Sequence, residues 1–90
     1  MITTLDLLDR LCKENQIHST REVAKLLGIH HSTVNNWRNG KTMSEDLACE
    51  VAVMLGLDPD FTLLAIIAER SKNERVFEAV ERITNQKRSA

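Results

Sequence analysis

Four uncharged polar side chains recur at helical spacing in the middle of the chain. They occupy positions i, i+3, i+4 and i+7 of an expected helix over 31–39: Ser32, Asn35, Asn36 and Asn39. A face selected only for solubility would more often carry Glu and Lys, which form helices better than Asn and Ser. Asn can bond adenine through two hydrogen bonds in the major groove, and Ser can donate to or accept from several bases. The face therefore predicts a base-reading surface, and the alternative is an amide-rich solvated face.

Two apolar residues fall on the opposite side of the same expected helix. Val34 and Trp37 share a phase that points them inward, so Trp37 is expected in the core rather than stacked on a base. Arg38 lies to one side and Lys41 follows, both placed to meet phosphates.

Histidine and cysteine are present but are not spaced as metal ligands. Adjacent His30 and His31 would point about 100° apart on a helix, and neither C-x2-C nor H-x3-H spacing occurs. Cys12 and Cys49 lie on apolar helix faces, where a thiol behaves as a small hydrophobe. We expect no metal, no cofactor and no small-molecule ligand.

No group of residues has the spacing of a catalytic site. The acidic pair in Asp58-Pro59-Asp60 is explained by helix capping, and neither a nucleophile with a base nor a cofactor-binding loop is visible. The sequence therefore does not predict an enzyme.

Composition and charge bound the remaining possibilities. Ninety residues at 42% apolar suffice for one globular domain, and the longest apolar run, 63–68, is far too short to cross a bilayer. The net charge of −1 hides an asymmetry, because residues 18–41 carry four basic side chains and one acidic one. No secretory signal opens the chain, so we expect a reducing cytoplasm.

The spacing of apolar residues, caps and glycines predicts an all-α chain of five or six short helices. Expected starts are Thr3, the S-x-x-E box at Ser19, the Thr42-x-x-Glu45 box, and Asp58 with Pro59. Expected ends are Gly28, Gly40 and Gly56, and a sixth helix or a bent continuation follows the polar break at 71–73. Residues 85–90 lack a cap and are expected to form a frayed tail.

The stretch STREVAKLLGIHHSTVNNWRNGKT, residues 19–42, resembles the helix-turn-helix of the Cro and repressor family of bacteriophage regulators. Ala24, Gly28 and the anchors Ile29, Val34 and Trp37 carry the resemblance, together with the loop 39–42. It implies a lambda-repressor-like DNA-binding domain with a C-terminal helical extension. It also implies a sequence-specific regulator of transcription, of phage or prophage type, that binds double-stranded DNA.

The resemblance also places contacts residue by residue. It implies base contacts from the helix in the major groove: His31, Ser32, Thr33, Asn35 and Asn36. The side chains expected to meet phosphates are Ser19, Thr20, Arg21, Arg38, Asn39, Lys41 and Thr42. His30 is a weaker N-cap than is usual in the family, so the first turn of this helix is expected to be irregular.

The C-terminal third of the chain carries more apolar surface than one small core is expected to bury. We expect it to form a homodimer on a palindromic operator through Leu63, Leu64, Ile66, Ile67, Val76, Phe77, Val80 and Ile83. The alternative is an antitoxin-like or anti-regulator module whose C-terminal helices bind a different protein. We therefore divide the chain into a DNA-binding core (1–57), helices that complete the core and pair subunits (58–84), and a tail (85–90).

Overall fold

The computed structural model describes the backbone of residues 1–89 and the side chains of residues 1–85. Within that range the chain is all α, as predicted, with six helices and no strand. The helices are α1 (Thr4–Asn15), α2 (Thr20–Leu27), α3 (His31–Arg38), α4 (Glu45–Met54), α5 (Pro59–Ser71) and α6 (Glu74–Ser89). None of them is long and apolar enough to cross a membrane.

Side-chain caps start the helices at most of the predicted residues. Thr3 forms a full capping box with Asp6, since its hydroxyl accepts from the Asp6 N–H at 3.2 Å and the Asp6 carboxylate accepts from the Thr3 N–H at 3.0 Å. Ser19 accepts from the Glu22 N–H at 3.1 Å, and Asp58 caps α5 ahead of Pro59 in its first turn.

The predicted capping box at Thr42 and Glu45 is wrong. Ser44 is the N-cap of α4, and its hydroxyl accepts from the Leu47 N–H at 3.3 Å. The Thr42 hydroxyl instead accepts a hydrogen bond from Arg70, which lies 28 residues away in the chain. A contact at that separation leaves no local spacing by which the sequence could distinguish the two candidate caps.

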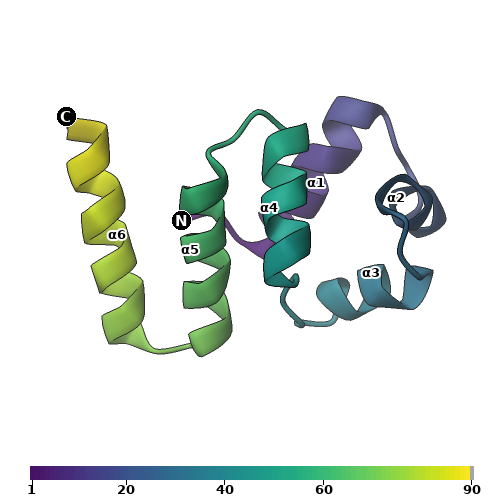
Figure 1. Cartoon of the computed structure of the whole chain (residues 1–90). Coiled ribbons are helices and arrows are strands. Elements are labelled where there is room, and N and C mark those ends of the chain that lie inside the picture. The colour runs from purple at the N-terminus through teal and green to yellow at the C-terminus, as the bar shows by residue number, and fades with distance from the viewer. Residues whose placement is uncertain (90) are drawn as a thin grey trace.

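Helices α1 to α5 pack together, and α6 lies outside them against α5 (Figure 1). α4 lies between α5 on one side and the α2–α3 pair on the other, while α1 contacts both α4 and α3. Their apolar faces form one core: Leu7, Leu8, Leu11, Val23, Ala24, Leu27, Val34, Trp37, Met43, Ala48, Val51 and Ile66. Cys12 and Cys49 are half-buried free thiols.

The C-terminal helices differ from the prediction in two respects. α5 and α6 are separate helices, broken at Lys72, whose φ of 54° lies in the left-handed region. α6 then continues to Ser89, so the frayed tail expected over 85–90 is wrong for the described residues, and Ala90 lies outside them. The segment after Ile83 has neither Gly nor Pro, and Gln, Lys and Arg are good helix formers.

Two of the eight residues expected between subunits are buried within the single chain. Ile66 is fully buried in the core and Val80 is only 7% exposed, so neither offers surface to a partner. α6 lies along the side of α5 that faces away from α4 (Figure 1), and this packing covers part of the apolar excess predicted for α5.

Candidate nucleic-acid interface

The α2–α3 pair is built around a left-handed turn. Gly28 ends α2 with φ of 68°, a conformation that costs an L-residue free energy but not glycine. The Ile29 N–H donates to the Ala24 carbonyl at 3.0 Å and closes the turn. α3 begins at His31, directly after it.

α3 has one buried side and one exposed side, as its sequence predicts. Val34 is fully buried and Trp37 is 2% exposed, which confirms that this aromatic ring belongs to the core. The polar face is exposed at all four positions: Ser32, Asn35, Asn36 and Asn39. Of the two remaining residues expected to read bases, His31 and Thr33, each is half-buried. Val34 and Trp37 therefore anchor one side of α3 in the core and hold the opposite side outward. We call this outward side, formed by Ser32, Asn35, Asn36 and Asn39, the amide face.

The first turn of α3 is irregular, as predicted: the His30 carbonyl accepts from the Thr33 N–H at 3.0 Å, three residues on, whereas the cap carbonyls of α1, α2, α4 and α5 accept from the residue four positions on. His30 is nonetheless the N-cap of α3. Its Nδ1 accepts from the Ser32 N–H at 3.2 Å and lies 2.8 Å from the Ser32 hydroxyl oxygen. Both the backbone and the side chain of Ser32 are thus joined to the cap residue. The His31 ring lies against that of His30, with centroids 4.3 Å apart.

Cations flank the amide face at both ends of the pair. Arg21 on α2 and Arg38 and Lys41 at the end of α3 are exposed, and none takes part in the ion pairs found among the described residues. Ser19 and Thr20 stand at the N-terminus of α2, where backbone N–H groups and the helix dipole favour an anion. These groups can donate hydrogen bonds to phosphates on either side of the uncharged amide face.

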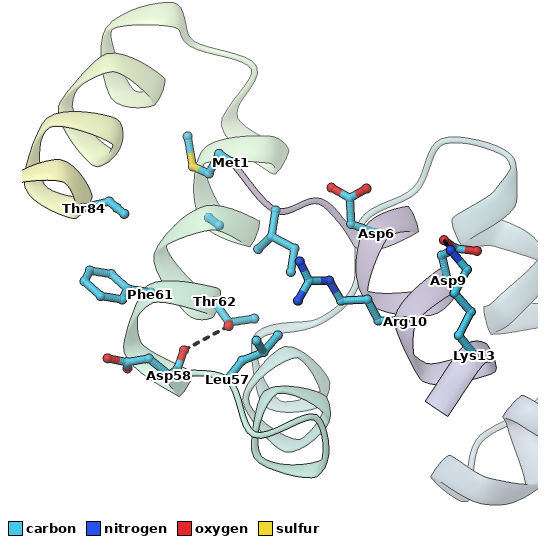
Figure 2. A pocket seen from close by; sticks show the side chains of 12 residues that line it. Met1, Asp6, Asp9, Arg10, Lys13, Leu57, Asp58, Phe61, Thr62 and Thr84 are labelled. Carbon is cyan, nitrogen blue, oxygen red and sulfur yellow. Dashed lines mark hydrogen bonds and ion pairs between the residues drawn. The ribbon is translucent and has the colours of Figure 1, made fainter. Parts of the chain in front are cut away.

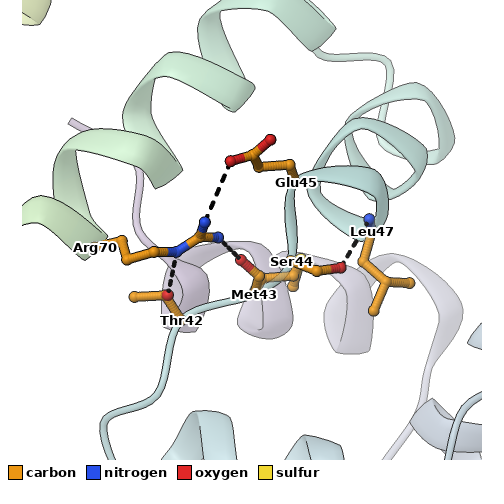
Figure 3. A network of polar contacts seen from close by, with 6 residues as sticks. All are labelled: Thr42, Met43, Ser44, Glu45, Leu47 and Arg70. Carbon is orange, nitrogen blue, oxygen red and sulfur yellow. Dashed lines mark hydrogen bonds and ion pairs between the residues drawn. The ribbon is translucent and has the colours of Figure 1, made fainter.

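The loop after α3 is held from outside the pair. Asn39 ends α3, and the Lys41 N–H donates to the Asn36 carbonyl at 3.0 Å. Thr42, expected to meet a phosphate, accepts a hydrogen bond from Arg70 Nε at 3.1 Å (Figure 3). The sequence does not point to Arg70, because an Arg at the end of an apolar run carries no sign of partners 25 to 28 residues earlier.

A sequence model of the Cro/C1-type helix-turn-helix DNA-binding domain matches residues 7–60. The chain belongs to this family. The match includes both helices of the pair and the loop after α3, and it ends at the start of α5. Comparisons with curated proteins and with solved structures gave no match. As a Cro/C1-type domain the chain is a DNA-binding one.

A hollow of about 690 Å³ lies on another part of this Cro/C1-type domain (Figure 2). It is lined by α1, the α4–α5 loop, α5 and Thr84 of α6, and its walls mix apolar residues such as Leu57 and Phe61 with charged ones such as Asp6 and Arg10. No lining residue comes from α2 or α3, so this hollow is separate from the amide face of α3. Among the described residues no three His, Cys, Asp or Glu side chains are grouped as metal ligands.

Proposed function

We propose that the chain is a sequence-specific transcriptional regulator that places α3 in the major groove of double-stranded DNA and acts as a homodimer on a palindromic operator. The observation that carries this proposal is the neutral, exposed amide face of α3, backed by the buried Val34 and Trp37. Because no charged side chain interrupts it, its hydrogen bonds depend on the bases opposite it rather than on phosphate charge. The likeness of residues 19–42 to bacteriophage regulators supports a phage or prophage source.

The phosphate contacts of the proposed complex come from both sides of this face. Arg21 and the N-terminus of α2 meet one strand, and Arg38, Asn39 and Lys41 meet the backbone beyond the other end of α3. The base-reading set is proposed as His31, Ser32, Thr33, Asn35 and Asn36.

The proposed homodimer rests on apolar side chains of α5 and α6 that the single chain leaves exposed or half-buried. Phe77 is 40% exposed and Ile83 is 51% exposed, while Leu63, Leu64, Ile67 and Val76 are half-buried. A two-fold pair would set its reading helices about 34 Å apart, one turn of DNA. The same exposed residues support the alternative of an antitoxin-like or anti-regulator module that binds a different protein. Sedimentation of the pure chain separates the two, since a monomer at all concentrations, with operator DNA present as well, refutes the homodimer.

Selection of binding sites from random duplexes tests the proposal directly. We expect an enriched half-site and a preference for it over random DNA, with log K falling by about 0.9 per neutralised phosphate for each unit of log salt. Equal and weak binding of selected and random duplexes at every salt concentration would refute sequence-specific regulation.

Variants in α3 and in the loop separate base contacts from phosphate contacts. We expect Asn36→Ala to relax the base preference, at a cost of about 1–3 kcal/mol on the selected site. Lys41→Ala serves as its matched comparison and should weaken all duplexes alike. A folded Asn36→Ala protein that keeps its full preference would show that the amide face is only solvated.

A further inference from the structure

Arg70, near the end of α5, contacts Thr42 and Met43 of the segment that joins α3 to α4, and Glu45, the first residue of α4 (Figure 3). Its Nε donates to the Thr42 hydroxyl at 3.1 Å, and its Nη2 donates to the Met43 carbonyl at 2.8 Å. Its Nη1 donates to the Glu45 carboxylate at 3.3 Å. One guanidinium therefore joins the last part of this segment and the start of α4 to α5.

Glu69, the neighbouring residue of α5, is linked to the same segment through Thr4. The Glu69 carboxylate accepts from the Thr4 N–H at 3.0 Å and from the Thr4 hydroxyl at 2.8 Å. That hydroxyl in turn accepts from the Met43 N–H at 2.9 Å. Both main-chain groups of Met43 are thus bound by side chains, and no backbone–backbone hydrogen bond of the described residues uses Thr42 or Met43. The conformation at Thr42 and Met43 therefore depends on Arg70, on Thr4 held by Glu69, and on the burial of the Met43 side chain in the core, rather than on backbone–backbone hydrogen bonds.

The Arg70 contact determines what the Thr42 hydroxyl can do. Since its oxygen accepts from Nε, its own proton is directed elsewhere and is available to an acceptor. A phosphate oxygen only accepts hydrogen bonds, so it is a suitable partner. Lys41, exposed beside it, adds a charge at the same place. The contact with Glu45 balances the charge of Arg70, so the effect of Arg70 on an anion is geometric more than electrostatic.

We propose that Arg70 is a positioning residue for DNA binding, which orients Thr42 and Lys41 toward one phosphate. This inference rests on the proposed function and extends it beyond the matched family region, because Arg70 lies ten residues past residue 60. The ion pair itself is exposed, at 44% for the Arg70 side chain and 55% for Glu45, so it contributes little to folding. The part-buried hydrogen bond to the Met43 carbonyl contributes to folding as well as to the orientation of the loop.

The test compares Arg70→Gln with Arg82→Gln in the full chain. Arg82 is an exposed residue of α6, on the far side of α5 from α3, so its replacement removes the same charge without touching the loop (Figure 1). Fluorescence anisotropy on the selected duplex and on a random duplex should show Arg70→Gln binding both about tenfold more weakly, the scale of one lost charge-assisted hydrogen bond. We expect a change below about twofold for Arg82→Gln, and an unchanged ratio between the two duplexes for both variants.

Three further measurements separate positioning from general loss of stability. Amide hydrogen exchange over 41–44, measured without DNA, should be faster in Arg70→Gln and unchanged in Arg82→Gln. Arg70→Lys should not restore binding, since an ammonium cannot hold three acceptors spread over this segment. Thr42→Val removes the hydroxyl at nearly constant volume, and the double variant with Arg70→Gln should lose less than the product of the two single losses.

The outcomes are distinguishable. Equal binding by Arg70→Gln and Arg82→Gln, restored binding by Arg70→Lys, independent losses in the double variant, or unchanged exchange over 41–44 would each overturn the positioning role while leaving DNA binding intact. A wild-type chain that prefers no duplex would overturn this inference together with the proposed function.

Discussion

Replacing Thr4 by Val tests how much of the fold depends on one buried hydroxyl. Thr4 is fully buried, and its hydroxyl is the acceptor for the N–H of Met43, whose side chain is also fully buried. Valine fills the same space but accepts nothing, so the Met43 N–H would be left without a partner, at a cost of about 1–3 kcal/mol. Glu69 loses one donor and keeps the Thr4 backbone N–H at 3.0 Å. We expect a loss of about 2–3 kcal/mol in the free energy of unfolding.

This loss is large for a domain of this size. Small domains are stable by about 5–15 kcal/mol, and each kcal/mol lowers the melting temperature by about 4–8 °C in domains of 60–100 residues. Urea denaturation gives the free energy, and a thermal melt followed by circular dichroism should show a decrease of about 10–20 °C.

Thr62→Val is the matched control for this prediction. Thr62 is 3% exposed, and its hydroxyl donates only to the Asp58 carbonyl, which also accepts the Thr62 N–H at 3.1 Å. The same substitution therefore leaves no group unpaired and should cost less than about 1 kcal/mol. If Thr4→Val destabilises the chain no more than Thr62→Val does, the reasoning from the unpaired Met43 N–H is refuted.

Three further outcomes can be checked with standard measurements. Ser44→Ala should cost about 1 kcal/mol in urea denaturation because it removes the N-cap of α4, and a neutral result would contradict the cap assignment. Gly28→Ala should also cost about 1 kcal/mol, entirely from backbone strain, since a Cβ there would meet nothing within 4 Å; an unchanged midpoint would refute this. Ile83→Glu should weaken self-association in sedimentation without lowering the melting temperature, whereas Val53→Glu on α4, at a residue 67% exposed, should change neither. Equal effects of these two variants would argue against an interface on α6.

Local signals in the sequence were sufficient for most of the fold and for the orientation of the reading face. Caps such as Ser19 and Asp58, and glycines such as Gly28, act over a few residues, so their spacing predicts where helices begin and end. The phase of Val34 and Trp37 is likewise a local property, and it correctly predicts which side of α3 is buried.

The errors at Thr42 and Ile66 have a common physical cause, which is competition from contacts between distant residues. Thr42 has the spacing of a helix cap, but its hydroxyl is taken by Arg70. Ile66 belongs to an apolar run that exceeds the expected core, yet it is fully buried. Its burial depends on how α5 packs against elements from the first half of the chain, and one sequence does not display that arrangement.

The hydrogen bonds of Thr4 have a consequence for the order in which the protein can assemble. The pairs α2–α3, α4–α5 and α5–α6 join helices adjacent in the chain, so each needs only a short loop to close. The hydrogen-bond partners of Thr4 are instead Met43 and Glu69, which lie 39 and 65 residues further along the chain. During synthesis the Thr4 N–H at the start of α1 therefore gains its hydrogen-bond partner only after the end of α5 has been made.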